Sequence, residues 1–315
     1  MKHLNFNSAG KFRICQVTDI HLGGFERAAT DAQTLALIRK VIIDQKPDLL
    51  VVTGDMSNNA GNDNRLKMLA DVCYDTGTLW ACILGNHDGT EKNDTLDRKA
   101  LGDFIPTLPN SLFEKGPDDI EGYGNYFITV GKQEAPAWAL IFIDSNNRRL
   151  YPGKDGNPAS GYDYIYRNQI DWYIKESGKL EQQFGHKLGE LAFFHNPLPE
   201  YNEVWNFNEC VGQKNEFICC PKTNTGMFAA MVDRGSMRGV FVGHDHINDF
   251  DGRLFGIRLC YGRGSGYSTY GLYGYLKGAR IIDLDANTSD FSSYLWLEDG
   301  TTHIQTRVHK PEHNY

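Results

Sequence analysis

The sequence contains little that would direct the chain to a membrane, a secretion route or a nucleic acid. No apolar run in its 315 residues approaches the ~18 residues that a transmembrane helix needs. The N-terminal residues lack the apolar segment of a signal peptide. Lys and Arg number 32 against 40 Asp and Glu, so the chain is a poor candidate for binding a long nucleic acid. We therefore expect a soluble cytoplasmic protein without a membrane partner.

Several enzyme motifs and cysteine pairs are also absent. The sequence has no P-loop, no G-x-G-x-x-G and no G-x-S-x-G, so nothing in it indicates a kinase, a dinucleotide-dependent enzyme or a serine hydrolase. Its seven cysteines form no C-x-x-C pair, which favours a reduced compartment. The role of the adjacent Cys219 and Cys220 stays open. Four cysteines lie in apolar segments and are expected in the core: Cys15, Cys73, Cys82 and Cys260.

Short apolar segments alternate with helical patterns along most of the chain. This order is typical of βαβ units with buried parallel strands. A Gly- and Tyr-rich segment at 253–284 follows and contains two expected antiparallel strands, so we predict an α/β fold in which a second sheet packs beneath the first. The predicted strands are 12–18, 49–53, 79–85, 138–144, 191–195 and 238–243. The predicted helices are 34–45, 64–76 and 167–184.

No repeat and no Pro- or Ser-rich linker divides the chain. We therefore predict a single domain over residues 1–315. Its core would span about 11–284, and a C-terminal strand and tail would occupy 285–315.

Polar side chains follow five of the predicted strands directly. Any one of these groups alone could be a turn, a helix cap or a hydrogen-bonded buried histidine. Together they collect at the carboxyl ends of strands, which is the edge where open α/β sheets bind ligands. The residues are Asp19 and His21, then Asp55, then Asn86, His87 and Asp88, then His195, and finally His244 and His246.

These residue types suit a pair of metal ions. Imidazole nitrogen combined with carboxylate or amide oxygen, without cysteine, favours Mn, Fe or Zn in an open site. Two ions roughly 3.5–4 Å apart can hold the attacking and leaving oxygens of an in-line displacement, and a hydroxide bound to them is nucleophilic near neutral pH.

At these residues the chain resembles a calcineurin-like metallophosphoesterase. The family pattern Asp-x-His, Gly-Asp, Gly-Asn-His-Asp, His, Gly-His-x-His is present in order from Asp19 to His246. The resemblance implies a four-layer α/β/β/α sandwich of two mixed sheets flanked by helices. It further implies that Asp19, His21 and His246 hold one metal ion, that Asn86, His195 and His244 hold the second, and that Asp55 bridges both. His87 would protonate the leaving oxygen or steady the phosphoryl group, and Asp88 would orient His87.

A narrower resemblance extends over about residues 11–284. The segments FFHNPLPEY (193–201), GHDHINDF (243–250) and LCYGRGSGYSTYG (259–271) are similar to the purple-acid-phosphatase-like branch of the family. That branch has Asp-x-Gly first and a tyrosine ligand three residues after the bridging aspartate. Here His21 and Asn58 occupy those two positions, so we expect neither a purple colour nor an obligatory ferric ion.

Three further groups have weaker signals. Arg263 and Tyr267 lie in the Gly-rich segment, where they could contact a substrate phosphate, although the simpler interpretation of that segment is a connecting loop. Tyr201 and Trp205 could form a lid over the leaving group. The segment 151–166 is expected to be a surface loop that borders the cleft.

The function that these residues favour is hydrolysis of small phosphate monoesters. A metal-bridging hydroxide would attack phosphorus, Asn86 and the two ions would neutralise the developing charge, and His87 would act as the acid. Three alternatives stay open: a phosphodiesterase acting on cyclic nucleotides or other small diesters, a protein phosphatase, and a non-catalytic metal-binding scaffold. The sequence identifies no protein partner.

Overall fold

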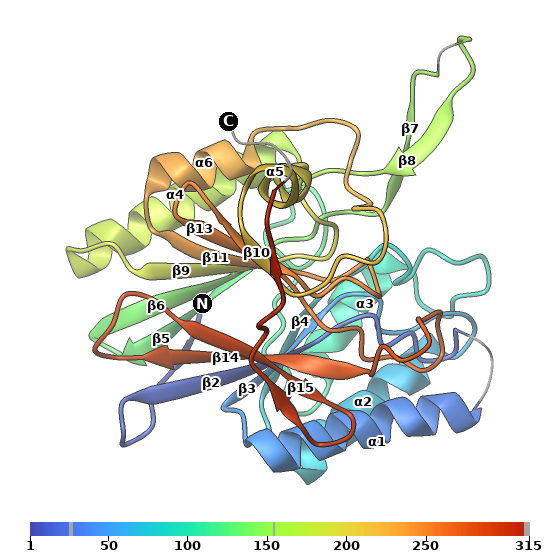
Figure 1. Ribbon diagram of the computed structural model, residues 1–315, viewed down its shortest axis with the longest axis horizontal. Coiled ribbons are helices and arrows are strands. Elements are labelled where there is room, and N and C mark those ends of the chain that lie inside the picture. The colour runs from blue at the N-terminus through green and yellow to red at the C-terminus, as the bar shows by residue number, and fades with distance from the viewer. Residues whose placement is uncertain (25–27, 154, 312–315) are drawn as a thin grey trace.

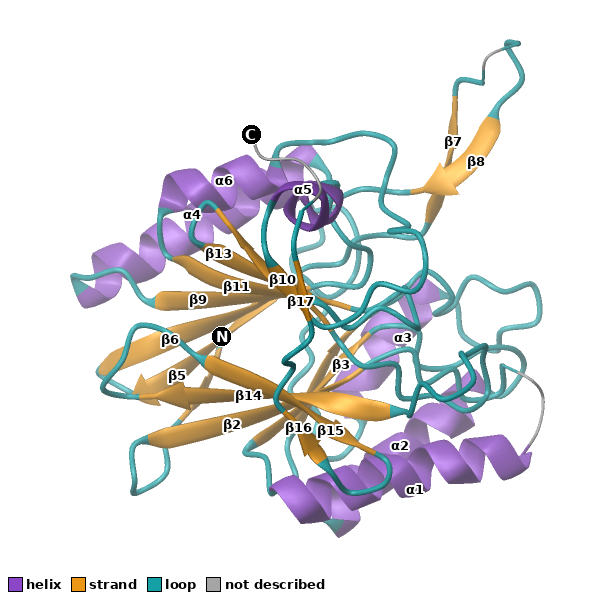
Figure 2. Ribbon diagram, viewed as in Figure 1, coloured by secondary structure: helices purple, strands orange, loops and turns teal. Residues whose placement is uncertain are grey.

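Two β-sheets lie face to face, and helices cover the outer face of each (Figures 1 and 2). The computed structural model describes residues 1–24, 28–153 and 155–311. Its layers follow the order helix, sheet, sheet, helix, so the predicted α/β/β/α sandwich is confirmed. None of the helices in this described part is long and apolar enough to cross a membrane.

Most strands of the N-terminal third of the chain lie in the first sheet. Its three strands β2, β3 and β4 run parallel, and the C-terminal strands add to it antiparallel. All five residues of β3 are buried, as expected for a strand covered on both faces. In spatial order the sheet is β16 (Thr302–His303), β15 (Ser292–Leu297), β14 (Gly278–Asp285), β2 (Lys11–Val17), β3 (Leu49–Thr53) and β4 (Trp80–Ile83).

The second sheet is longer and mixed. Its central strands β6, β9, β11 and β13 are parallel to one another, and antiparallel pairs lie toward both edges. In spatial order it is β1 (Lys2–Leu4), β5 (Tyr126–Lys132), β6 (Ala135–Phe142), β9 (Gly189–Phe193), β11 (Met237–Val242), β13 (Ile257–Tyr261), β12 (Asp251–Leu254), β10 (Cys210–Val211) and β17 (Val308–His309).

The helices cover the sheets through apolar faces. Helix α1 buries Leu37, Ile38, Val41 and Ile42 against the first sheet. The helices α1 (Ala28–Gln45) and α2 (Asn62–Asp75) cover the first sheet, and α4 (Arg167–Phe184), α5 (Glu200–Phe207) and α6 (Met227–Arg234) lie on the side of the second (Figure 2). Two short helices, α3 (Arg98–Phe104) and η1 (Ile105–Thr107), follow β4.

A row of aromatic side chains crosses the second sheet from strand to strand. Tyr126, Phe142, Phe193 and Phe241 stack in sequence with ring centroids 4.4, 5.2 and 5.2 Å apart. Tyr126 also donates its hydroxyl to the carbonyl of Cys82 in the first sheet, at 2.7 Å. The row therefore contributes to the packing between the two sheets.

All six predicted strands and all three predicted helices occur, with ends shifted by a few residues. The expected C-terminal strand is β15, while the later β17 joins the other sheet; residues 312–315 of the predicted tail lie outside the described residues. The predicted surface loop at 151–166 is largely a hairpin of β7 (Arg148–Tyr151) and β8 (Ala159–Tyr162), with residue 154 outside the description. This hairpin projects from the body of the molecule (Figure 1).

One buried arginine joins the two sheets. Arg280 on β14 is completely buried and donates to the carbonyls of Tyr261 and Asp249, at 2.6 and 2.7 Å. Its remaining N–H groups contact Ser293 and Gln305. The buried charge is thus surrounded by acceptors, which is the condition for keeping a cation in a core.

We predict that Arg280→Met lowers the free energy of unfolding by about 2–5 kcal/mol, because the carbonyls that Arg280 satisfies lose their donor. Arg280→Lys keeps the charge but loses the planar fork, so its loss should be smaller. Denaturant titration measures both, with the exposed Arg39→Met as control. A loss for Arg280→Met no larger than that of the control would contradict this role.

Candidate metal centre

The predicted ligands meet where the two sheets face each other. Asp19 and His21 follow β2, Asp55 follows β3 and Asn86 follows β4, all in the first sheet. From the second sheet, His195 follows β9, and His244 and His246 follow β11. Each group of strands is parallel within its sheet, so the carboxyl ends of both groups deliver their side chains to one place.

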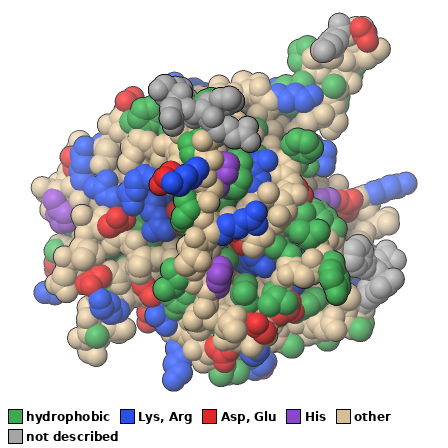
Figure 3. Space-filling model, viewed as in Figure 1, with side chains coloured by type: hydrophobic (Ala, Val, Ile, Leu, Met, Phe, Trp, Pro, Cys, Tyr) green, Lys and Arg blue, Asp and Glu red, His purple; other side chains and the backbone are tan. Residues whose placement is uncertain are grey.

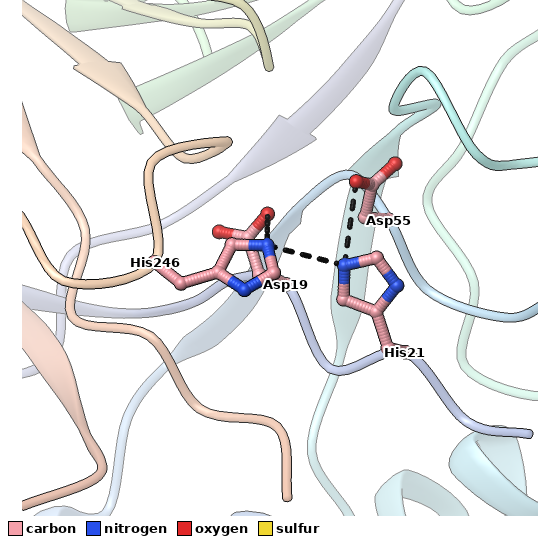
Figure 4. A group of neighbouring side chains, drawn as sticks. All are labelled: Asp19, His21, Asp55 and His246. Atoms are coloured by element: carbon pink, nitrogen blue, oxygen red, sulfur yellow. Dashed lines mark hydrogen bonds and ion pairs between the residues drawn. The ribbon is translucent and has the colours of Figure 1, made fainter. Parts of the chain in front are cut away.

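Four side chains form the first cluster. One donor atom from each of Asp19, His21, Asp55 and His246 lies within 4.8 Å of the others, and all four residues are buried. His21 Nε2 lies 3.3 Å from His246 Nε2 and 3.4 Å from Asp55 Oδ2, and His246 Nε2 lies 3.5 Å from Asp19 Oδ1 (Figure 4). This spacing suits one metal ion between the four donors.

The second cluster shares Asp55 with the first. His195 Nε2 lies 3.2 Å from Asp55 Oδ2, 3.1 Å from Asn86 Oδ1 and 3.3 Å from His244 Nδ1. Asp55, His195 and His244 again offer donor atoms within 4.8 Å of one another. The structure thus brings together every residue predicted as a ligand and places Asp55 between the two clusters.

Hydrogen bonds on the outer ring nitrogens direct lone pairs inward. His195 Nδ1–H donates to the carbonyl of Thr53 at 2.8 Å, and His21 Nδ1 bonds Asn58 Oδ1 at 3.0 Å. Each ring, when neutral, therefore presents an unprotonated Nε2 to the cluster. His246 Nδ1 is likewise bonded to the Thr269 hydroxyl, at 3.1 Å. The Nε2 atoms of His21 and His246 face each other across 3.3 Å and also face carboxylates. This arrangement suits a cation between them.

The ring of His244 faces the cluster with its other nitrogen. Its Nδ1 faces the cluster, and its buried Nε2 has no hydrogen-bond partner among the residues that the structure describes. The ring is held instead by Tyr162, whose centroid lies 4.3 Å away in an edge-on contact.

Burial and mutual charge shift the protonation of these groups in opposite directions. Burial raises the pKa of Asp19 to about 7 and lowers the pKa of His21 to about 4. Burial also disfavours the charged forms of Asp55 and His195, but the attraction between these two side chains outweighs it. The pKa of Asp55 therefore lies well below its usual value, and that of His195 rises to about 9. Protons therefore compete for these donor atoms, and binding of metal ions would release them.

The backbone around the ligands is strained and tightly packed. Asp19, His21, Asp55 and His244 have φ angles of 53°, 43°, 49° and 77°, in the left-handed region that such residues seldom adopt. A Cβ atom at Gly85 would lie 2.2 Å from the backbone nitrogen of Asp55, so this position requires glycine. The glycine before Asn86 is therefore needed to bring the ends of β3 and β4 together.

His87 lies beside the clusters, but its partner is not the predicted one. The ring of His87 is 5.3 Å from that of His21, and its Nδ1 bonds Glu91 Oε1 at 2.7 Å. Asp88, which we predicted to orient His87, instead accepts from the backbone N–H groups of Gly85, Met56 and Ser57 at 2.8–3.1 Å. The prediction for Asp88 is corrected: it fixes the loops after β3 and β4, and Glu91 holds His87.

A pocket of about 250 Å³ opens above the two clusters. Its walls include Tyr270, which sequence reasoning did not place at the site, and Tyr162, which lies in the segment 151–166. The ring of Tyr270 stacks on His246 at 4.0 Å, and its hydroxyl donates to Glu216 at 2.8 Å. The hairpin that carries Tyr162 therefore borders the cleft, as expected for the segment 151–166.

The predicted substrate contacts Arg263 and Tyr267 are not brought to this pocket. The buried Arg263 guanidinium forms an ion pair with Asp249 and covers the Tyr275 ring at 3.2 Å. Tyr267 donates its hydroxyl to Glu298. Both side chains are engaged elsewhere, so the structure does not support a phosphate contact from either.

The lid predicted from Tyr201 and Trp205 is also not formed. Tyr201 is fully buried and donates to the carbonyl of Val240 at 3.0 Å. Trp205 stacks on His309 with centroids 3.8 Å apart. Both rings are part of the packing around α5.

A family model and several known proteins match this chain in sequence. A family model described as calcineurin-like phosphoesterase matches residues 12–248. The chain is 33% identical to a protein of Arabidopsis thaliana named probable inactive purple acid phosphatase 29, over 91% of this chain and 80% of that protein. It is 31% identical to a Saccharomyces cerevisiae protein named phosphatase DCR2, over 96% of this chain and 56% of that protein.

A solved structure shares the fold. A dimetal phosphatase from Danio rerio superimposes with a TM-score of 0.57 over 90% of this chain and 98% of that one, at 13% sequence identity. The match supports the architecture of two mixed sheets with flanking helices.

We predict that Mn²⁺ stabilises the chelator-treated protein, by about 2.7 kcal/mol for each ion at a hundredfold excess over its dissociation constant. Asp55→Asn removes the charge shared by the two clusters, so the rise in melting temperature should be largely lost. The control is Asp290→Asn, which changes an exposed carboxylate. Equal stabilisation of Asp55→Asn and the wild type would show that Mn²⁺ binds elsewhere.

Proposed function

Because the chain belongs to the calcineurin-like phosphoesterase family, we propose that it hydrolyses small phosphate monoesters with two transition-metal ions bound at the clusters described above. Family membership makes it a metal-dependent phosphoester hydrolase. The preference for monoesters and the roles of individual residues are proposals. The observation that carries the metal-dependent chemistry is the convergence of inward-facing imidazole nitrogens on Asp19 and Asp55.

Seven side chains would hold the two ions. Bound ions would supply a nucleophilic water near neutral pH and would neutralise charge on the phosphoryl oxygens. The donor set is free of sulfur, and Mn, Fe or Zn would fit it. Asp19, His21 and His246 would hold the first ion, Asn86, His195 and His244 the second, and Asp55 both.

His87 would transfer the proton to the leaving oxygen. It lines the pocket, and its bond to Glu91 occupies Nδ1 and leaves Nε2 for the substrate. The backbone N–H of His87 donates to Asp55 Oδ1 at 2.8 Å, which ties its position to that of the proposed bridging ligand. Glu91 is a positioning residue here, because it acts through His87.

The site lacks the tyrosine expected in the purple-acid-phosphatase-like branch, but it keeps all seven candidate ligands. The position that the resemblance assigns to a tyrosine holds Asn58, which bonds the outer nitrogen of His21. Asn58 would therefore orient a ligand instead of being one. Some relatives carry the word inactive in their names, but this chain keeps all seven side chains and His87, which supports an active enzyme over a scaffold.

The direct test compares phenyl phosphate with diphenyl phosphate, using the chelator-treated protein reloaded with Mn, Zn or Fe. We predict metal-dependent release of phenol with a higher kcat/KM for the monoester, and no turnover without metal. A preference for the diester would assign the protein to the phosphodiesterases. A preference for phosphopeptides over both would assign it to the protein phosphatases, and metal binding without turnover of any ester would favour a scaffold.

We predict that His87→Ala lowers kcat by about 10²–10⁴-fold, the usual contribution of a general acid. Metal content should stay unchanged, because His87 is not among the proposed ligands. Glu91→Gln should have an intermediate effect, since it keeps an oxygen at Nδ1 but removes the charge. Glu134→Gln, a change in an exposed turn, is the control. Unchanged kcat in His87→Ala would exclude the proposed acid.

A further inference from the structure

Arg148 lies near the metal centre without a carboxylate partner. It is exposed on β7, and within residues 1–24, 28–153 and 155–311 no Asp or Glu forms an ion pair with it. Its neighbour Arg149 differs, because it pairs with Asp163 at 3.5 Å and covers Tyr164 at 4.5 Å. Successive side chains of a strand point to opposite faces, so the two guanidinium groups lie on different sides of β7 and have different surroundings.

An aromatic ring connects Arg148 to the candidate ligands. Its guanidinium carbon lies 4.7 Å from the centroid of Tyr162, and Nη2 donates to the Tyr162 hydroxyl at 3.4 Å. Tyr162 in turn contacts His244, with centroids 4.3 Å apart, and lines the pocket. A stacked guanidinium loses rotamer freedom but keeps N–H donors for a further acceptor.

The hairpin that carries both residues stands away from the body of the molecule. It projects beside the loops that follow the strands (Figure 2), and the space-filling view shows Lys or Arg side chains at its base and an acidic side chain near its tip (Figure 3). Tyr151 donates to the backbone carbonyl of Tyr162 at 2.7 Å across the hairpin, which holds the strand segment that carries Tyr162. A positive charge is thus held beside Tyr162, which lines the pocket.

We infer that Tyr162 and Arg148 form a subsite for the leaving group, and that the preferred substrates are phosphate monoesters whose leaving group itself carries an oxyanion. This inference rests on the proposed function. With the phosphoryl group at the metal centre, a leaving group that passes Tyr162 reaches the guanidinium, which can bind a carboxylate or a second phosphate through two parallel N–H donors. Arg148 is a specificity-determining residue in this account.

The test compares three substrates of similar shape: phenyl phosphate, 4-carboxyphenyl phosphate and 1,4-phenylene bisphosphate. The ratio of kcat/KM for each charged ester to that for phenyl phosphate is measured in each variant, so that the esters' intrinsic reactivity cancels. In Arg148→Gln we expect the ratio to fall about threefold to tenfold, as for a partly exposed bidentate ion pair. Arg148→Lys should restore part of it, and Arg167→Gln, an equal charge change on α4, should leave it unchanged.

Two further measurements separate charge recognition from a structural effect. Rising ionic strength should reduce the wild-type ratio and have little effect on that of Arg148→Gln, because salt screens an exposed ion pair. Calorimetric binding of 4-carboxyphenylphosphonate against phenylphosphonate, neither of which is hydrolysed, should show the same loss in Arg148→Gln. A larger fall for the carboxylate than for the bisphosphate would identify carboxylates as the recognised anion, and the reverse would identify phosphates.

The outcomes distinguish this inference from the function on which it rests. If the metal-loaded wild type hydrolyses none of the three esters, the proposed function fails. If it hydrolyses them but Arg148→Gln keeps the wild-type ratio and the wild-type binding difference, the subsite is wrong and the hydrolase proposal stands.

Discussion

The arrangement depends on unprotonated donor atoms being brought together in a buried place. Two carboxylates and four imidazoles meet there, and the outer nitrogens of at least His21 and His195 are occupied by hydrogen bonds. Lone pairs that face each other at such distances repel unless a proton or a metal ion lies between them. The opposite pKa shifts of Asp19 and Asp55 show how unevenly protons alone satisfy the cluster. Two cations would satisfy all of the donors at once.

The fold supplies the rigidity that such a cluster requires. Parallel strands in each sheet end at the same edge, and the left-handed backbone at four candidate ligands is sustained by the packing around them. Arg280 ties β14 to the end of β13, and Asp88 ties the loops after β3 and β4. The contacts of Arg280 join the two sheets, and those of Asp88 hold together two loops of the first sheet.

The sequence predicts the strands, the main helices and the ligand cluster, because apolar runs that end in Asp, Asn or His carry a clear signal. It does not predict partners that only the tertiary structure brings close. Asp88 follows His87 directly, yet three backbone N–H groups engage it, while Glu91 four residues later reaches the ring. The ion pair of Arg263 with Asp249 depends on how the chain returns through β12 and β13. Tyr162 comes to the pocket only because it ends the strand β8 at the base of its hairpin.

The most direct test of the central claim is anomalous diffraction from crystals of the protein soaked with Mn²⁺. The account predicts two peaks roughly 3.5–4 Å apart, one beside Asp19, His21 and His246 and the other beside Asn86, His195 and His244, with Asp55 between them. Peaks at other residues, or a fully ordered cluster that takes up no Mn²⁺ at saturating concentration, would contradict it.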